Sequence, residues 1–337
     1  MTNTDYRQIA KQVRAYAQAR TGRAWLEVIF TVVPFVTIFA AAAALWGHYP
    51  IISILLTVPA AFFMVRIFLV QHDLGHGSFF RHKGLNKWVG KALGATTGIP
   101  YSYWKRTHAM HHATTGNLDK RGAGDVTTWT VEEYRNAGFW SRLGYRFYRH
   151  PLVIIVLGPA FLLLKMRVPF GHPTPFKENW RSILSNNVVL AAIVILLGTF
   201  LGFGFVAAVY CLTLYLAMMI GIWLFYVQHQ FEDAYWAPQE TWNYHQAAIE
   251  GSSQLAMPGF MNWLTANIGL HHIHHLDSKV PFYRLKEVVR SIPDLEAVNK
   301  ISWLRTPRLL TLTLYDEACQ RMVSFREARR NSSTENA

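Results

Sequence analysis

Long apolar stretches constrain the fold of this chain more than any other feature of its sequence. The first two run over 25–46 and 51–70 and are separated by a short turn at 47–50. A further block from 186 to 228 contains no charged residue and is long enough for two segments, 186–203 and 205–228, that meet near Gly202. A helix of about 20 apolar residues crosses the roughly 30 Å of bilayer hydrocarbon. We therefore predict an all-α membrane protein with four transmembrane helices in two hairpins.

The distribution of basic residues predicts which side of the membrane each part occupies. Neither hairpin turn contains Lys or Arg, Arg66 lies inside a span, and all the other Lys and Arg fall on the side that both termini share. The positive-inside rule then places both termini in the cytoplasm. The stretch 152–164 is broken by Gly158 and Pro159 and is too short to cross, so we expect an interfacial or re-entrant segment there. Residues 71–185 and 229–337 would form a helical cytoplasmic cap.

Composition narrows the class of protein further. Hydrophobic residues make up 51% of the 337 residues and charged residues only 16%, which is unlike a soluble enzyme. The net charge of +13 favours anionic lipid head groups over nucleic acid as a partner. The two cysteines, Cys211 and Cys319, are too few and too far apart for a disulfide framework or a zinc–thiolate site. We expect one integrated domain over 1–330 and a disordered tail over 331–337.

Most of the 15 histidines fall into clusters. His72 and His76 follow the second span at a spacing that places both on one helical face. A second cluster comprises His108, His111 and His112, and four of the five residues from 271 to 275 are histidine. His229 follows the end of the last span just as His72 follows the end of the second.

Imidazole suits iron, copper, zinc and nickel, but about nine clustered histidines exceed the needs of one metal ion. Soluble di-iron bundles use Glu-x-x-His motifs. This chain contains no such motif. An all-histidine di-iron site is therefore the best fit to the pattern.

The residues around these clusters resemble the integral-membrane fatty acid desaturases, in particular the bacterial acyl-lipid, omega-6/delta-12-like branch. The similar segments are His-Asp-Leu-Gly-His-Gly-Ser-Phe-Phe from His72, the run from His108 to Trp129, the segment from Gln228 to Asp233, and Asn267 to Leu270 before the third cluster. The resemblance covers nearly the whole chain. It implies an oxygen-dependent enzyme that introduces a cis double bond into a lipid-linked acyl chain.

The resemblance also implies a site. It has two iron ions, O2 as a co-substrate that is reduced to water, and no catalytic side chains beyond the metal ligands. The implied ligands are His72, His76, His108, His111, His112, His229, His271, His274 and His275. His272 is interior to the third cluster and ranks below its neighbours. Electrons would come from an external carrier, a ferredoxin or flavodoxin with its reductase, and the protein would lie in the bacterial inner membrane with its site facing the cytoplasm.

Residues around the site can be suggested from chemistry. Metal-bound histidines usually donate their second ring N–H to a carboxylate or carbonyl group. Candidate partners are Asp73, Asp119, Asp125, Glu232, Asp233 and Asn267. Candidate walls of an acyl channel are the aromatic residues Tyr101, Tyr103, Trp104, Trp223 and Tyr226. The remaining histidines, His48, His82, His150, His172 and His245, are expected to be interfacial or surface residues.

Two other functions fit parts of the pattern. A membrane di-iron hydroxylase or ketolase of the same superfamily would use the same ligands on an acyl or other apolar substrate. A transporter or metal sensor is disfavoured because the clusters do not lie at mid-membrane, where coupling ions usually bind. The basic cap could dock an acidic electron carrier or contact lipid phosphates, and the sequence leaves open the double-bond position, the acyl carrier, the electron donor and the oligomeric state.

Overall fold

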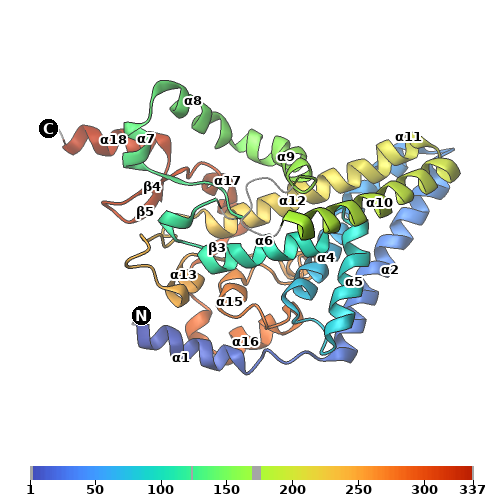
Figure 1. Ribbon diagram of the computed structural model, residues 1–337, viewed down its shortest axis with the longest axis horizontal. Helices are drawn as coiled ribbons and strands as arrows, with labels where there is room; N and C mark the ends of the chain where they lie inside the picture. Colours follow the sequence, from blue (N-terminus) through green and yellow to red (C-terminus); the bar gives the residue numbers. More distant parts are fainter. Residues whose placement is uncertain (1–2, 123, 169–175, 336–337) are drawn as a thin grey trace.

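Long apolar helices extend from a cap of short helices and strands and converge toward a common tip (Figure 1). This is a computed structural model, which describes residues 3–122, 124–168 and 176–335. Both described ends of the chain lie on the cap, away from the tip where the two hairpin turns meet.

Four helical segments are long and apolar enough to cross a membrane. The first hairpin is formed by α2 (Thr21–Leu45) and by α3 (Pro50–Leu55) with α4 (Thr57–His76). The second is formed by α10 (Phe176–Leu201) and by α11 (Phe203–Phe205), the π-helical turn η3 (Val206–Cys211) and α12 (Leu212–His229). The prediction of four transmembrane helices in two hairpins is confirmed. The helices are longer than the predicted spans because polar residues extend them at the cap end.

The four spans differ in how much of their surface the protein itself covers. In α2 and α10 only 17% of the most apolar window is buried, compared with 44% in the span that contains α4 and 39% in the span that contains α12. Apolar surface left uncovered by α2 and α10 requires lipid around it. Packed against each other, α4 and α12 form the centre of the membrane layer, and both end in histidine.

A bent segment, which we call the arm (139–165), lies beside α12. It consists of α8 (Phe139–Tyr148), the π-helical turn η2 (Val153–Leu157) and α9 (Gly158–Lys165). The two parts meet at 66°, so this segment is a broken span or a re-entrant loop, and the number of spans is four or up to five. The stretch predicted to be interfacial, 152–164, corresponds to η2 and α9, and its position in the membrane stays a prediction.

The cap is built mainly from short helices. They are α1 (Asn3–Arg14), α5 (Lys83–Thr96), α6 (Tyr101–Thr114), η1 (Leu118–Lys120), α7 (Val131–Asn136), α13 (Tyr244–Glu250), α14 (Gly259–Leu264), α15 (His271–Leu276), η4 (Phe282–Arg284), α16 (Leu285–Ser291), η5 (Pro293–Leu295), η6 (Trp303–Arg305), α17 (Thr306–Leu309) and α18 (Phe325–Glu335). One connected apolar core includes residues from Tyr6 to Met322. Of the tail predicted to be disordered, 331–335 continue α18 and 336–337 lie outside the described residues, so that disorder stays a prediction.

Among the described residues, two small sheets depart from an all-helical fold. In the first, β1 (Trp129–Thr130) pairs in parallel with β4 (Leu314–Asp316), which pairs antiparallel with β5 (Arg321–Val323). In the second, β2 (Gln254–Ala256) pairs in parallel with β3 (Lys300–Ser302), with Leu255 opposite Ile301. The first sheet joins the C-terminal segment to the chain that follows the second histidine cluster, and the second joins it to the chain that precedes the third cluster.

The N-terminal helix α1 is held on the cap next to the third histidine cluster. Tyr6, Ile9 and Val13 recur at helical spacing, are buried, and face the packing partners α13 and α15. The hydroxyl of Tyr6 donates to the carboxylate of Glu250, and Arg14 Nη1 lies 3.0 Å from Asp277 Oδ2. These contacts join the first residues of the chain to the segment that carries His271–His275.

An ion pair is buried in the first hairpin. Arg66 of α4 is only 1% exposed, and its guanidinium donates to the carboxylate of Glu27 on α2 and to the backbone oxygen of Trp263. Its Nε donates to Thr31 Oγ1 at 3.0 Å, and its Cζ lies 4.4 Å from the centre of the Trp263 ring. The two charges that interrupt the first two apolar stretches therefore neutralise each other, and they join α2, α4 and α14.

We expect Glu27→Ala to destabilise the protein by about 3–5 kcal/mol, because it leaves the buried guanidinium of Arg66 without its main partner. Unfolding of the purified protein in lipid nanodiscs would measure the change. The matched control is Glu132→Ala, which removes an exposed carboxylate and should change stability by no more than about 0.5 kcal/mol. Equal stability of the two variants would contradict a structural role for the pair.

Candidate metal centre

Nine histidines come together where four helices meet. α4 supplies His72 and His76 from successive turns, and α6 supplies His108, His111 and His112. His229 is the last residue of α12, and His271, His274 and His275 lie on α15. All nine residues that the resemblance implied as ligands are therefore in one place.

The nine rings form two groups, in each of which one nitrogen per ring lies within 4.8 Å of all the others. The first group contains His72, His76, His108, His112 and His274, and the second contains His111, His229, His271 and His275. In the first, Nε2 of His108 lies 2.9 Å from that of His72 and 3.0 Å from that of His112. In the second, Nε2 of His229 lies 3.2 Å from that of His111 and 3.0 Å from that of His271. The same ring atom thus points inward in most of the rings.

The two groups are immediate neighbours. The rings of His112 and His275, one from each group, are stacked with their centres 4.1 Å apart. Burial, followed by the neighbouring imidazoles, lowers the pKa of His108, His112 and His275 well below the ordinary value. These rings are therefore neutral at physiological pH, which is the form that binds metal ions.

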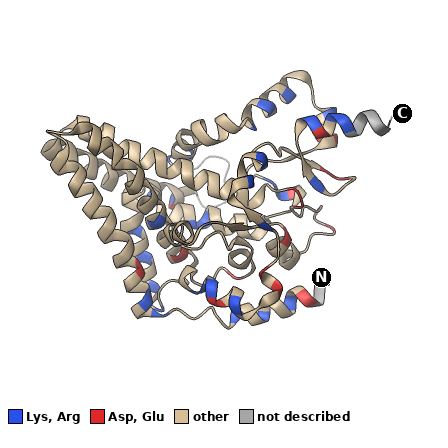
Figure 2. Ribbon diagram, turned by 180° about the vertical axis from the view of Figure 1, so that it is seen from behind, with Lys and Arg blue, Asp and Glu red and all other residues tan. Residues whose placement is uncertain are grey.

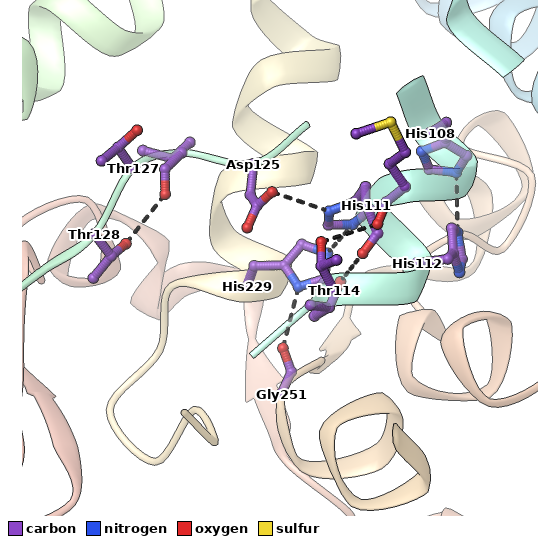
Figure 3. A network of polar contacts seen from close by, with 12 residues as sticks. His108, His111, His112, Thr114, Asp125, Thr127, Thr128, His229 and Gly251 are labelled. Atoms are coloured by element: carbon purple, nitrogen blue, oxygen red, sulfur yellow. Dashed lines mark hydrogen bonds and ion pairs between the residues drawn. The ribbon is translucent and has the colours of Figure 1, made fainter. Parts of the chain in front are cut away.

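The outward-facing nitrogens show how three of the rings are oriented. His72 Nδ1 donates to Asp73 Oδ1 at 3.1 Å, and the second oxygen of Asp73 accepts the backbone N–H of Phe282 at 2.6 Å. His229 Nδ1 donates to the backbone oxygen of Gly251 at 3.1 Å (Figure 3). Asp125 Oδ1 lies 3.8 Å from His111 Nδ1, so its carboxylate faces the ring without a normal hydrogen bond (Figure 3).

The donor set fits a pair of metal ions. A neutral imidazole has one donor nitrogen and one acceptor nitrogen. When Nδ1 donates outward, as in His72 and His229, Nε2 is a lone-pair acceptor that faces other acceptors. A cation between them would give these lone pairs a common partner. The structure therefore brings together two groups that could each hold a metal ion.

Other candidates from the sequence lie elsewhere. Asp119 Oδ2 accepts the backbone N–H of Gln239, the carboxylate of Glu232 pairs with Arg305 and Arg308, and Asp233 is exposed. The side-chain amide of Asn267 donates to the Phe282 backbone oxygen at 3.5 Å rather than contacting a histidine. Sequence position alone does not distinguish these residues from Asp73, because the contact depends on which way each side chain points in the fold.

The histidines ranked outside the site are also outside the two groups. His272 Nε2 bonds with the backbone oxygen of Leu295 at 3.0 Å, and burial lowers its pKa to about 4. His48 is exposed in the first hairpin turn, and His245 is half-buried in α13. The ring nitrogens of His82 and His150 accept backbone N–H groups in their own turns, and His172 lies outside the described residues.

Two aromatic side chains cover the groups on the membrane side. The Trp104 ring is stacked on His108 at 4.6 Å, and it fits there because residue 75 is glycine, where a Cβ would lie 2.9 Å from the indole. The ring of Phe225 lies 5.1 Å from His111 and 5.2 Å from His229. Phe225 lies four residues before His229, which places both on the same helical face.

An apolar cavity of about 560 Å³ extends from these rings along α12. Its walls include His72 and His108 from the first group and His271 from the second. The remaining wall is mainly aliphatic and aromatic and comes largely from α4, α6, α12 and the arm.

Only one of the five proposed channel residues, Trp104, lines this cavity. Tyr101 instead donates to the backbone oxygen of Leu74, and Tyr226 donates to that of Leu312, so their hydroxyls point into the protein. Tyr103 is fully buried and Trp223 packs against the core, and neither is among the described lining residues. The sequence did not reveal that the arm forms a wall of the cavity. The arm is far along the chain from every histidine cluster, and no motif in it indicates a contact with the site.

Comparison with known proteins identifies similar chains. The fatty acid desaturase family matches residues 51–303. A fatty acid desaturase of Bacillus subtilis (strain 168) is 40% identical over 323 residues, which cover 95% of this chain and 91% of the relative.

More distant relatives come from cyanobacteria. The sn-1 acyl-lipid omega-3 desaturase (ferredoxin) of Synechocystis is 31% identical over 268 residues, covering 75% of this chain and 70% of the relative. The sn-1 oleoyl-lipid 12-desaturase of Arthrospira platensis is 25% identical over 286 residues, covering 78% and 74%.

Replacing His229 by alanine should remove roughly half of the bound metal, because the second group would keep only three of its four rings. Metal content of the purified protein, measured by mass spectrometry, tests this. His272→Gln is the matched control, since its amide can still bond to Leu295 and the ring belongs to neither group. Loss of metal in His272→Gln, or full retention in His229→Ala, would overturn the division into ligands and non-ligands.

Asp73→Asn should weaken metal binding about 10- to 100-fold, because the amide is uncharged and has one accepting oxygen for the N–H groups of His72 and Phe282, where the carboxylate has two. Competition with a chelator gives the affinity. Asp233→Asn makes the same chemical change at an exposed position and should have no effect. If both variants retain the affinity of the unaltered protein, Asp73 does not orient its neighbour.

Proposed function

Because this chain belongs to the fatty acid desaturase family, we propose that it introduces a cis double bond into acyl chains carried by membrane lipids. One observation carries this proposal. The apolar cavity of about 560 Å³ has histidines of both groups in its wall, so an acyl chain inside it would pass beside both candidate metal sites. Cavities of this size typically enclose most of the surface of a small ligand.

In this proposal the nine histidines hold two iron ions, five rings around one and four around the other. When bound, the iron would support a reaction that side chains cannot perform. In this reaction O2, one hydrogen from each of two adjacent methylenes, two external electrons and two protons give the alkene and two water molecules. The chain itself fixes the position of the substrate and excludes bulk water.

The cavity wall shows how the chain would position a substrate. From Leu214 to Gln228 the lining residues of α12 extend over about 21 Å at the helical rise of 1.5 Å per residue. The stacked Trp104 and the ring of Phe225 give the histidine end of the cavity an apolar wall. Orientation of the reacting carbons beside the metals supplies a large part of such catalysis.

The charge distribution supports a cytoplasmic cap. Lys and Arg gather on the cap and on the cap-side ends of the long helices, and the tip with the two hairpin turns has none (Figure 2). We infer that the cap and both termini face the cytoplasm, and that the membrane is the bacterial inner membrane.

A basic edge beside the first histidine group suits an acidic electron carrier. Lys279 Nζ donates to the backbone oxygen of His76 at 2.5 Å, and this contact is exposed. Burial lowers the pKa of Lys105, and repulsion by the nearby charge of Lys279 lowers it further. The relatives in Synechocystis and Nostoc are named ferredoxin-dependent acyl-lipid desaturases, which supports a lipid substrate and a ferredoxin, with flavodoxin as the other candidate donor.

The first experiment is the fatty acid profile of a bacterial host that expresses the chain or its His111→Ala variant. Mass spectrometry with double-bond localisation should show a new unsaturated acyl chain with the unaltered protein alone. Oxygenated acyl chains would instead indicate the hydroxylase reaction. An unchanged profile despite correct expression and a supplied ferredoxin and reductase would contradict the proposal.

Gly221→Leu should shift the chain length or the double-bond position of the product. Gly221 lines the cavity, and a Cβ there would meet no atom within 4 Å, so leucine would fill substrate space one helical turn from Phe225. We expect turnover of the longest acyl chains to fall about tenfold or more, and that of shorter chains to persist.

The control is Gly144→Leu on the exposed side of α8, where a Cβ also meets no atom within 4 Å and which is not among the described lining residues of the cavity. Product analysis by mass spectrometry compares the two. An identical product profile for both variants would show that the α12 face of the cavity does not hold the substrate.

A further inference from the structure

The cavity reaches the outside of the protein at the arm. Four described lining residues are exposed on the molecular surface: Phe147 (63%), Tyr148 (36%), Leu157 (52%) and Phe161 (63%). All four belong to the arm, whereas the described lining residues of α4, α6 and α12 are buried or half-buried. A side chain that is exposed outside and also lines the cavity marks a wall only one side chain thick.

The outer surface of the arm has the composition of a surface that contacts lipid. Residues 139–165 contain no acidic residue, and Arg142, Arg146 and Lys165 lie on either side of an uncharged apolar stretch from Pro151 to Leu164, while Arg149 is buried. The other large exposed apolar side chains of the arm are Phe139, Trp140, Leu143, Leu152, Val156 and Leu164. Basic residues at the level of the lipid phosphates and apolar residues below them are typical of a segment that enters the bilayer from its surface.

The arm is fixed to a membrane-spanning helix at its bend. Both η2 and α9 pack against α12. The hydroxyl of Tyr215 on α12 donates to the backbone oxygen of Val156, within the π-helical turn. Gly158 allows close contact, since a Cβ there would lie 3.2 Å from Ile222 Cδ1. The apolar surface of the arm is therefore continuous with that of α12, and the two share one lipid environment.

We propose that the arm is a lateral portal, through which the acyl chain of a bilayer lipid enters the cavity between Leu157 and Phe161. These residues are four apart and share one face of the arm. The head group stays at the membrane surface near the basic residues that flank the apolar stretch. This inference rests on the proposed function and specifies the route by which its substrate arrives.

The test uses the full-length protein, purified without added iron or reductant, in nanodiscs of phosphatidylcholine that carries a diazirine on its acyl chain. Irradiation followed by peptide mass spectrometry measures the lipid attached to the inner wall, at Met218 and Leu224 of α12, which are both buried. Leu157→Trp narrows the portal and should reduce this labelling several-fold. Leu164→Trp is the matched control, because Leu164 is exposed on the same helix but is not among the lining residues, so labelling should be unchanged.

Equal inner-wall labelling in Leu157→Trp and Leu164→Trp would overturn the portal. So would labelling by a soluble diazirine acyl-coenzyme A but not by the lipid, which would place the route on the aqueous side. If Leu157→Trp does not fold, as judged by gel filtration, Phe161→Trp narrows the same face and carries the same expectation.

Failure of the proposed function gives a different result. Inner-wall labelling that depends on Leu157, together with an unchanged fatty acid profile in the host, would refute desaturation and leave the portal intact. If the protein desaturates membrane lipid and neither Leu157→Trp nor Phe161→Trp changes that activity, the portal alone would be refuted.

Discussion

Imidazole rings that face one another through their Nε2 atoms are the constraint on which the rest of this structure depends. Nine rings are drawn from α4, α6, α12 and α15, and Nε2 atoms lie 2.9–3.2 Å apart within each group. Each ring needs a hydrogen-bond acceptor for its outward N–H group and a cation for its inward lone pair. The outside partners are Asp73 and the backbone oxygen of Gly251, and the inside partner that fits is a metal ion for each group. Because the rings come from segments up to about 200 residues apart, the site exists only when spans and cap are assembled together.

The sequence was most informative where chemistry repeats at a helical spacing. Apolar stretches of about 20 residues predicted the four spans, and the spacing of His72 from His76 and of His108 from His112 predicted rings on shared faces. His229 had no such partner nearby in the sequence, and its place among the rings rested on the resemblance. The partners of the rings were harder to predict. A backbone oxygen such as that of Gly251 has no residue type to reveal it, and Asp73 and Asp233 look alike until the fold turns one inward and leaves the other in solvent.

The walls of the cavity show the same limit. Tyr101 and Trp104 lie one turn apart on α6, beside the same histidines in the sequence. Trp104 stacks on His108, whereas the hydroxyl of Tyr101 reaches back to the Leu74 backbone oxygen. The difference is decided by Gly75, which leaves room for an indole at one point of α4. The arm was recognised as a short broken segment, but its role as a wall depends on contacts with α12 that no periodicity encodes.

The buried pair of Arg66 and Glu27 also has a consequence for biogenesis. A charged residue in a nascent transmembrane helix opposes its transfer from the translocon to lipid, by roughly 2.5–3.5 kcal/mol at the helix centre. Glu27 has Arg23 one turn before it on α2, whereas Arg66 of α4 is neutralised by Glu27, which is synthesised 39 residues earlier. The first hairpin is thus built to leave the translocon as a unit, with its charges already joined. The helix that carries His72 and His76 is delivered to the membrane in register with its neighbour before any metal arrives.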